Sequence, residues 1–110
     1  MDDRDRATLK AAQDSARIAI DHVRTGGTNW RQDPKTIDAA AKRVEDVGEL
    51  LRRVTPERQA ALPGIPWRQV KGMRDRIVHD YTGIDLDILE DVIENNLPSL
   101  IAEIDSVLDD

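Results

Sequence analysis

The supply of core-forming side chains is the feature of this sequence that most constrains its fold. The chain has no Phe and no Cys, and its aromatic side chains are Trp30, Trp67 and Tyr81 alone. Sheets favour aromatic and β-branched residues, whereas Ala, Leu, Arg and Glu favour helices. A core of Ala, Leu, Ile and Val therefore predicts packed helices. The lack of cysteine excludes a disulfide framework, a zinc finger and a thiol nucleophile.

Length and composition predict a single domain over residues 1–110, because domains cluster near about 100–150 residues. Charged residues make up 35% of the chain and hydrophobic residues 39%, which is too apolar for a disordered chain and too polar for a membrane chain. The first residues lack the apolar segment of a secretory signal, and no stretch approaches the roughly 20 apolar residues of a spanning helix. We expect a cytoplasmic protein that does not bind a membrane.

Apolar residues recur every three or four positions along two long segments, which is typical of amphipathic helices. The first helix is expected from about Asp3 to Arg24, where Gly26-Gly27 stops it. The second begins where Asp33 can cap a helix and Pro34 fits the first turn. Its apolar stripe consists of Ile37, Ala40, Val44, Val47, Leu51 and Val54. This spacing suits a nearly parallel neighbour in a bundle.

Two helices are predicted in the middle of the chain. A short one runs from Glu57 to Leu62, and a longer one runs from Ile65 to about His79 or Asp80, where Thr82-Gly83 ends it. The expected buried face of the longer helix consists of Trp67, Val70, Met73 and Ile77.

Asp85 is expected to cap the last helix, which Pro98 should kink or restart near Asn96, because proline removes a backbone hydrogen bond. The predicted fold class is all-α: an up-and-down bundle of four main helices plus one short helix.

Charge is distributed unevenly along the chain. Residues 52–76 carry seven basic and two acidic groups, whereas residues 77–110 carry ten acidic groups and no Lys or Arg. This distribution argues against general coating of nucleic acid but permits one local anion-binding surface. The alternative is that the basic segment simply pairs with the acidic one.

The supply of reactive residues excludes most catalytic arrangements. His22 and His79 are the two histidines, so a His-x-x-x-His zinc site is impossible. Neither histidine follows a Glu by three residues, as carboxylate-bridged metal bundles require. The sequence contains no glycine-rich phosphate loop and no nucleophile elbow. We read the acidic run of the last helix as a solvated face and expect neither metal nor cofactor.

Arg74, His79 and Tyr81 lie within eight residues of one another. Histidine can move a proton near neutral pH, and arginine can grip a phosphate and stabilise its developing charge. RNA supplies its own nucleophile, the 2′-hydroxyl, so this trio suits RNA cleavage without a metal, although it is also typical of an ordinary helix end. On one straight helix Arg74 and His79 lie about 140° apart. A shared site therefore predicts two copies of the helix in a two-fold dimer.

The pattern Arg74-x-x-x-x-His79-x-Tyr81 resembles the signature of HEPN-domain proteins, in particular the HepT toxin family. The flanking blocks that match in order and spacing are Ile65-Pro66-Trp67-Arg68, Gly72-Met73-Arg74, Gly83-Ile84-Asp85-Leu86 and Asn96-Leu97-Pro98-x-Leu100. The resemblance covers residues 65–101.

The resemblance implies an all-helical homodimer whose paired motifs line a cleft. It implies a metal-independent ribonuclease toxin of a type VII toxin–antitoxin pair, whose partner, the MntA nucleotidyltransferase, transfers AMP to the motif tyrosine. It assigns phosphate binding to Arg74, acid–base chemistry to His79 and modification to Tyr81. Asp75 stands where the family most often has Asn, and Asp80 where Gly is expected.

Two functional hypotheses follow. The first is an endoribonuclease toxin that cuts RNA through 2′-hydroxyl attack, with Asp75 and Tyr81 supporting the motif and with Arg68, Lys71 and Arg76 as possible RNA contacts. The second is a HEPN module that contacts RNA, a nucleotide or a partner protein without cutting. A histidine phosphotransfer domain is disfavoured, because the Lys and small residues that normally follow its histidine are missing.

Overall fold

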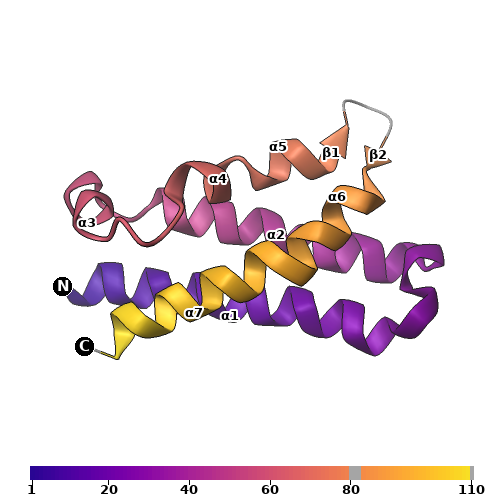
Figure 1. Ribbon diagram of the computed structural model, residues 1–110, viewed down its shortest axis with the longest axis horizontal. Coiled ribbons are helices and arrows are strands. Elements are labelled where there is room, and N and C mark those ends of the chain that lie inside the picture. Colours follow the sequence, from indigo (N-terminus) through magenta and orange to yellow (C-terminus); the bar gives the residue numbers. More distant parts are fainter. Residues whose placement is uncertain (80–82, 110) are drawn as a thin grey trace.

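The computed structural model describes residues 1–79 and 83–109, and for His79 it describes the backbone alone. It is an elongated helical bundle of 42 × 28 × 19 Å, in which α1 and α2 lie side by side and α7 runs along α1 (Figure 1). The elements are α1 (Asp3–Gly26), η1 (Gly27–Gln32), α2 (Pro34–Arg52), α3 (Pro56–Ala61), α4 (Trp67–Lys71), α5 (Met73–Ile77), β1 (Val78–His79), β2 (Gly83–Ile84), α6 (Leu86–Asp91), η2 (Val92–Asn96) and α7 (Leu97–Leu108). The predicted all-α bundle is confirmed. None of the described helices combines the length and the apolar character that a membrane crossing requires.

The first long helix ends within two residues of the predicted position, and the second begins where the sequence predicts. The Asp33 carboxylate accepts a hydrogen bond from the Lys35 N–H at 3.1 Å and caps α2, with Pro34 in the first turn. After α1, Gly27 has a φ of +74°, in the left-handed region that glycine adopts without strain. The 3₁₀ segment η1 was not predicted, and it buries Trp30 against the core.

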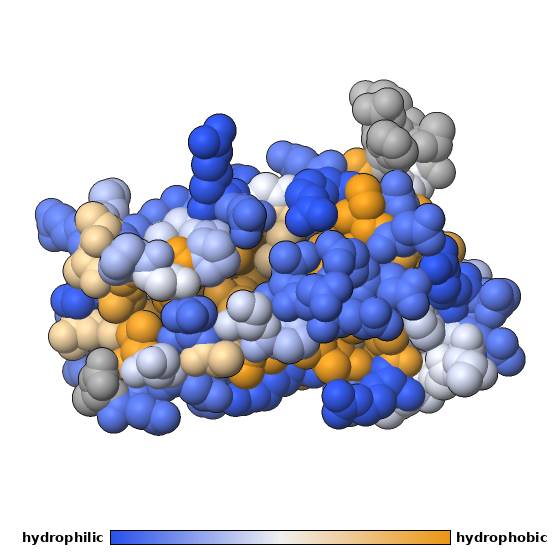
Figure 2. All heavy atoms as spheres, in the orientation of Figure 1, coloured by the Kyte–Doolittle hydropathy of each residue, from blue (hydrophilic) through white to orange (hydrophobic). Residues whose placement is uncertain are grey.

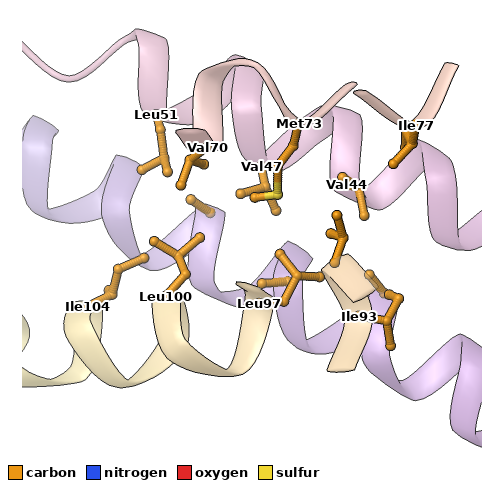
Figure 3. Close-up of a cluster of buried hydrophobic side chains, with 14 of the residues drawn as sticks. Val44, Val47, Leu51, Val70, Met73, Ile77, Ile93, Leu97, Leu100 and Ile104 are labelled. Carbon is orange, nitrogen blue, oxygen red and sulfur yellow. The ribbon is translucent and has the colours of Figure 1, made fainter. Parts of the chain in front are cut away.

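The core lies where α1, α2, α4, α5, η2 and α7 meet, and apolar side chains from these helices converge there (Figure 3). The residues labelled there are Val44, Val47, Leu51, Val70, Met73, Ile77, Ile93, Leu97, Leu100 and Ile104. All ten are at most 5% exposed. The predicted apolar stripes therefore mark the buried faces correctly. A chain this short depends on such a continuous core.

The prediction of one long helix from Ile65 to His79 or Asp80 is wrong. The segment is divided at Gly72 into α4 and α5, and helical structure ends at Ile77 rather than at Thr82-Gly83. Glycine weakens a helix interior, and β-branched residues such as Ile77 and Val78 favour extended backbone. Val70, Met73 and Ile77 are buried as predicted, whereas Trp67, the fourth residue of that predicted face, is only partly buried.

A short antiparallel hairpin replaces the end of that predicted helix. Val78 pairs with Ile84 and His79 with Gly83, and the Asp85 N–H donates to the Ile77 carbonyl at 2.7 Å. Gly83 has a φ of +109°, a conformation that favours glycine. Asp85 then caps α6 as predicted, because its carboxylate accepts from the Ile88 N–H at 3.1 Å. The chain therefore reverses immediately after α5.

Arg31 of η1 forms ion pairs with two carboxylates of α6. Its Nη2 lies 2.6 Å from the Asp87 carboxylate, and its Nη1 lies 2.7 Å from that of Glu90. The hydrogen bond to Asp87, together with the charges of both carboxylates, raises the pKa of the Arg31 guanidinium. Part of the acidic face of α6 is thus paired with the first half of the chain rather than with residues 52–76.

The last helical stretch changes its winding before Pro98, as predicted. Residues Val92–Asn96 form a π-helical segment, and α7 begins at Leu97 with Pro98 in its first turn. Proline lacks the N–H that an interior position would need, so a restart just before it satisfies the backbone. The restart keeps Leu97, Leu100 and Ile104 in the core.

Candidate functional site

Arg74 lies on α5, and residues before and after it on this helix are buried in the core. Met73 is 2% exposed and Ile77 is fully buried, so this short helix has a defined rotation about its axis. At about 100° per residue, Arg74 lies to one side of this buried pair and Arg76 to the other. The sequence therefore places the two arginines on opposite flanks of the same helix.

The guanidinium of Arg74 lies between two carboxylates. Its Nε is 3.8 Å from Oε1 of Glu45 on α2, and its Nη1 is 3.5 Å from Oδ1 of Asp75. The Arg74 side chain is 54% exposed and that of Asp75 is 75% exposed. The guanidinium is thus held at the surface, where an anion can reach it, but its charge is partly balanced by its neighbours.

Arg76 faces α6 and not α2. Its Nη2 lies 3.8 Å from Oδ2 of Asp91, with both side chains about half exposed. This ion pair joins the basic segment 52–76 to the acidic segment 77–110, as the pairing hypothesis predicts. Arg74 does not follow it, because its cross-helix partner comes from α2.

The other two candidate RNA contacts lie on α4. Arg68 is exposed, and among the described residues it has no carboxylate within 4 Å. Lys71 is half-buried, and its Nζ donates to Oε1 of Gln59 at 2.6 Å. The described partners of Lys71, Arg74 and Arg76 thus differ from one another.

His79 lies in β1, where its backbone pairs with Gly83. Its side chain, together with Asp80, Tyr81 and Thr82, falls outside the residues that the structure describes. The helical angle of about 140° between Arg74 and His79 does not apply, because α5 ends at Ile77, two residues before the histidine. The backbone of His79 therefore belongs to β1 and not to a continuation of α5.

The face of the molecule that carries α6 is largely polar. Figure 2 shows hydrophilic residues over most of the face that carries α6 and the hairpin, with hydrophobic residues visible between them. A hollow of about 540 Å³ lies between α1, η2 and α7, and another of about 420 Å³ lies between α1 and α2. Neither is lined by Arg74. Within the described residues, the acidic side chains of α6 and η2 form no cluster able to hold a metal ion.

Sequence reasoning missed Glu45 as a neighbour of Arg74. Glu45 borders the apolar stripe of α2 next to Val44, so its position beside a helix–helix contact was visible in the pattern. The pattern alone did not reveal which helix packs there, because Glu45 and Arg74 are 29 positions apart.

Comparison with known proteins shows which family this sequence matches. The family model described as HepT-like, Ribonuclease HepT-like, matches residues 12–107. The match therefore includes most of α1, all of α2 and the α4–α5 segment, and not only the region 65–101 that carries the motif blocks.

Curated relatives are similar over most of this chain. A Methanocaldococcus jannaschii protein named provisionally as an RNase is 30% identical over 79 residues, covering 72% of this chain and 65% of the relative. A Thermococcus cleftensis protein named as a probable ribonuclease HepT is 34% identical over 68 residues, covering 62% of each chain. A Caldanaerobacter subterraneus protein named provisionally as an RNase is 27% identical over 77 residues, covering 70% of this chain and 69% of the relative. The chain spans slightly less than two thirds of the first two relatives. No solved structure matches it.

Proposed function

This chain belongs to the HepT-like ribonuclease family, and from that premise we propose that it is a metal-independent endoribonuclease with Arg74 and His79 as its catalytic residues. The observation that carries the proposal is the placement of Arg74. Its guanidinium is exposed on a helix anchored in the core, five residues before His79. A cation that can bind a phosphate and a histidine that can move a proton together support phosphate chemistry on RNA.

The proposed reaction is an internal transfer. The ribose 2′-hydroxyl loses its proton to a base and attacks the adjacent phosphorus, and the 5′-oxygen of the next nucleotide leaves with a proton from an acid. The products are a 2′,3′-cyclic phosphate and a 5′-hydroxyl end. His79 serves as the base or the acid, and Arg74 stabilises the extra negative charge on the phosphate in the transition state.

We propose that the working site is shared by two copies of the chain. Arg74 lines neither of the two hollows described above and stands on an open surface. A two-fold dimer that brings two α5 segments together would create a cleft with an Arg74 and a His79 from each chain. Such a cleft would supply one histidine as base and the other as acid.

Cleavage by the purified protein in excess EDTA tests the activity. We expect RNA fragments with 2′,3′-cyclic phosphate and 5′-hydroxyl ends, because neither catalytic residue needs a metal. An intact mass of the protein must first confirm that Tyr81 is unmodified. RNA binding by unmodified protein with no cleavage would contradict the proposal and favour the non-catalytic HEPN module. The carboxylates of Glu45 and Asp75 beside Arg74 are the observation that supports that alternative.

We further propose that the protein is a toxin neutralised by adenylylation of Tyr81 by an MntA-type nucleotidyltransferase. AMP on a tyrosine two residues after His79 would add bulk and negative charge beside the phosphate-binding site, and like charge repels RNA. Incubation with that partner and ATP is expected to add one or more AMP units and abolish cleavage. The Tyr81→Phe variant is expected to gain no mass and stay active. A Tyr81→Phe protein that is still modified and silenced would contradict the proposal.

A further inference from the structure

Glu45 lies outside the motif and is nevertheless the cross-helix neighbour of its arginine. Within the described part of the chain, it provides the one carboxylate from another helix that lies within 4 Å of Arg74, with 3.8 Å between Oε1 and Nε. Asp75 also contacts the guanidinium, but it is the next residue on the same helix and is 75% exposed. Glu45 is 42% exposed and comes from α2, whose position the core determines.

The face of α2 that carries Glu45 packs directly against the end of α4. A Cβ added at Gly48 would lie 3.3 Å from the Val70 carbonyl oxygen, which is close backbone packing. One turn further on, Nη2 of Arg52 donates to the Lys71 carbonyl at 3.1 Å. Residues 45, 48 and 52 share one side of the helix. The distance from Glu45 to Arg74 is thus determined by helix packing and not by a loop.

We infer that Glu45 is a positioning residue for Arg74 in RNA cleavage, an inference that rests on the proposed function. Arginine has many rotamers, and its guanidinium must lie in one plane to form two parallel hydrogen bonds to a phosphate. A carboxylate on the Nε edge restricts those rotamers before RNA arrives, so less freedom is lost in the transition state. The Nη nitrogens stay available for the phosphate once the Asp75 contact is exchanged.

Glu45 could instead compete with RNA for the charge of Arg74, and that role predicts a different kinetic result. If Glu45 only neutralises Arg74, its removal strengthens RNA binding and does not slow cleavage. The two roles separate in the kinetics. Loss of positioning lowers kcat with little change in KM, whereas loss of a competing charge lowers KM.

The test compares Glu45→Ala and Glu45→Gln with Glu49→Gln in the dimeric wild-type background. Glu49 is a matched control, because it lies one turn further along α2, is similarly exposed and pairs with Arg52 at 3.6 Å. We expect Glu45→Ala to lower kcat on the order of 10-fold with KM within about 3-fold. Glu45→Gln keeps an oxygen that can accept from Nε, so its loss of kcat should be smaller than that of Glu45→Ala. Glu49→Gln should cleave like the wild type, and all three variants should melt at similar temperatures.

A second comparison asks whether Glu45 acts through Arg74. In an Arg74→Lys background the planar fork is gone, so Glu45→Ala should cause no further loss of kcat. A full 10-fold further loss in that background would overturn the inference, as would Glu45 variants that cleave as fast as or faster than the wild type. If the wild type cleaves and Glu45 variants match it, the inference fails and the proposed function stands. If unmodified wild type does not cleave, both fail.

Discussion

Replacing Arg74 by alanine is expected to lower the rate of RNA cleavage about 100- to 1000-fold, the range typical of losing one group that stabilises transition-state charge. The fold should be little affected, because the Arg74 side chain is 54% exposed. Initial rates on one RNA in excess EDTA, with thermal unfolding of the same samples, measure both quantities.

Arg76→Ala is the matched control for that substitution. Arg76 has the same charge, lies on the same helix and also pairs with a carboxylate at 3.8 Å, but it faces α6. We expect its removal to change cleavage less than about 5-fold, mainly through RNA binding that weakens with salt. Equal losses in both variants would contradict a specific role for Arg74 and indicate general charge attraction.

Replacing His79 by alanine is expected to lower cleavage by about 100- to 10,000-fold, the contribution typical of a positioned acid or base. The remaining products should carry the same cyclic phosphate ends, because the RNA still supplies the nucleophile. RNA binding should persist, since the proposal assigns phosphate binding to Arg74. Rates and end-group analysis of the purified variant in excess EDTA check this prediction.

His22→Ala is the control for the second prediction. His22 is the other histidine of the chain and lies near the end of α1, away from the motif in sequence and partly exposed. Its removal should leave cleavage unchanged. Cleavage at the wild-type rate in His79→Ala would remove His79 from the mechanism. An equal loss in His22→Ala would show that the effect is not specific to His79.

The helix pattern could be predicted from the sequence because each signal is local. The apolar stripe of α2 follows from spacing alone, and Asp33 with Pro34 marks its start by hydrogen bonds within one turn. The change in the last helix near Asn96 is also a local effect, since Pro98 lacks the N–H that would bond to the preceding turn. No partner from another part of the chain is needed for any of these.

The break in the motif segment could not be predicted in this way. The stripe of Val70, Met73 and Ile77 has helical spacing, and residues that face the core keep that spacing across the break at Gly72. The helix ends at Ile77 because backbone pairing with Gly83–Asp85 replaces its next turn. That competition depends on pairing between two separate segments, which the spacing within one segment does not reveal.

The sequence by itself determined the all-helical class, the buried faces and the motif that carries Arg74, His79 and Tyr81, because spacing, caps and residue chemistry act over short distances. Only the tertiary structure decided that the two arginines of α5 face different helices and that Glu45 stands beside Arg74. Such pairings depend on the rotation of each helix about its axis. The packing of the whole core sets that rotation.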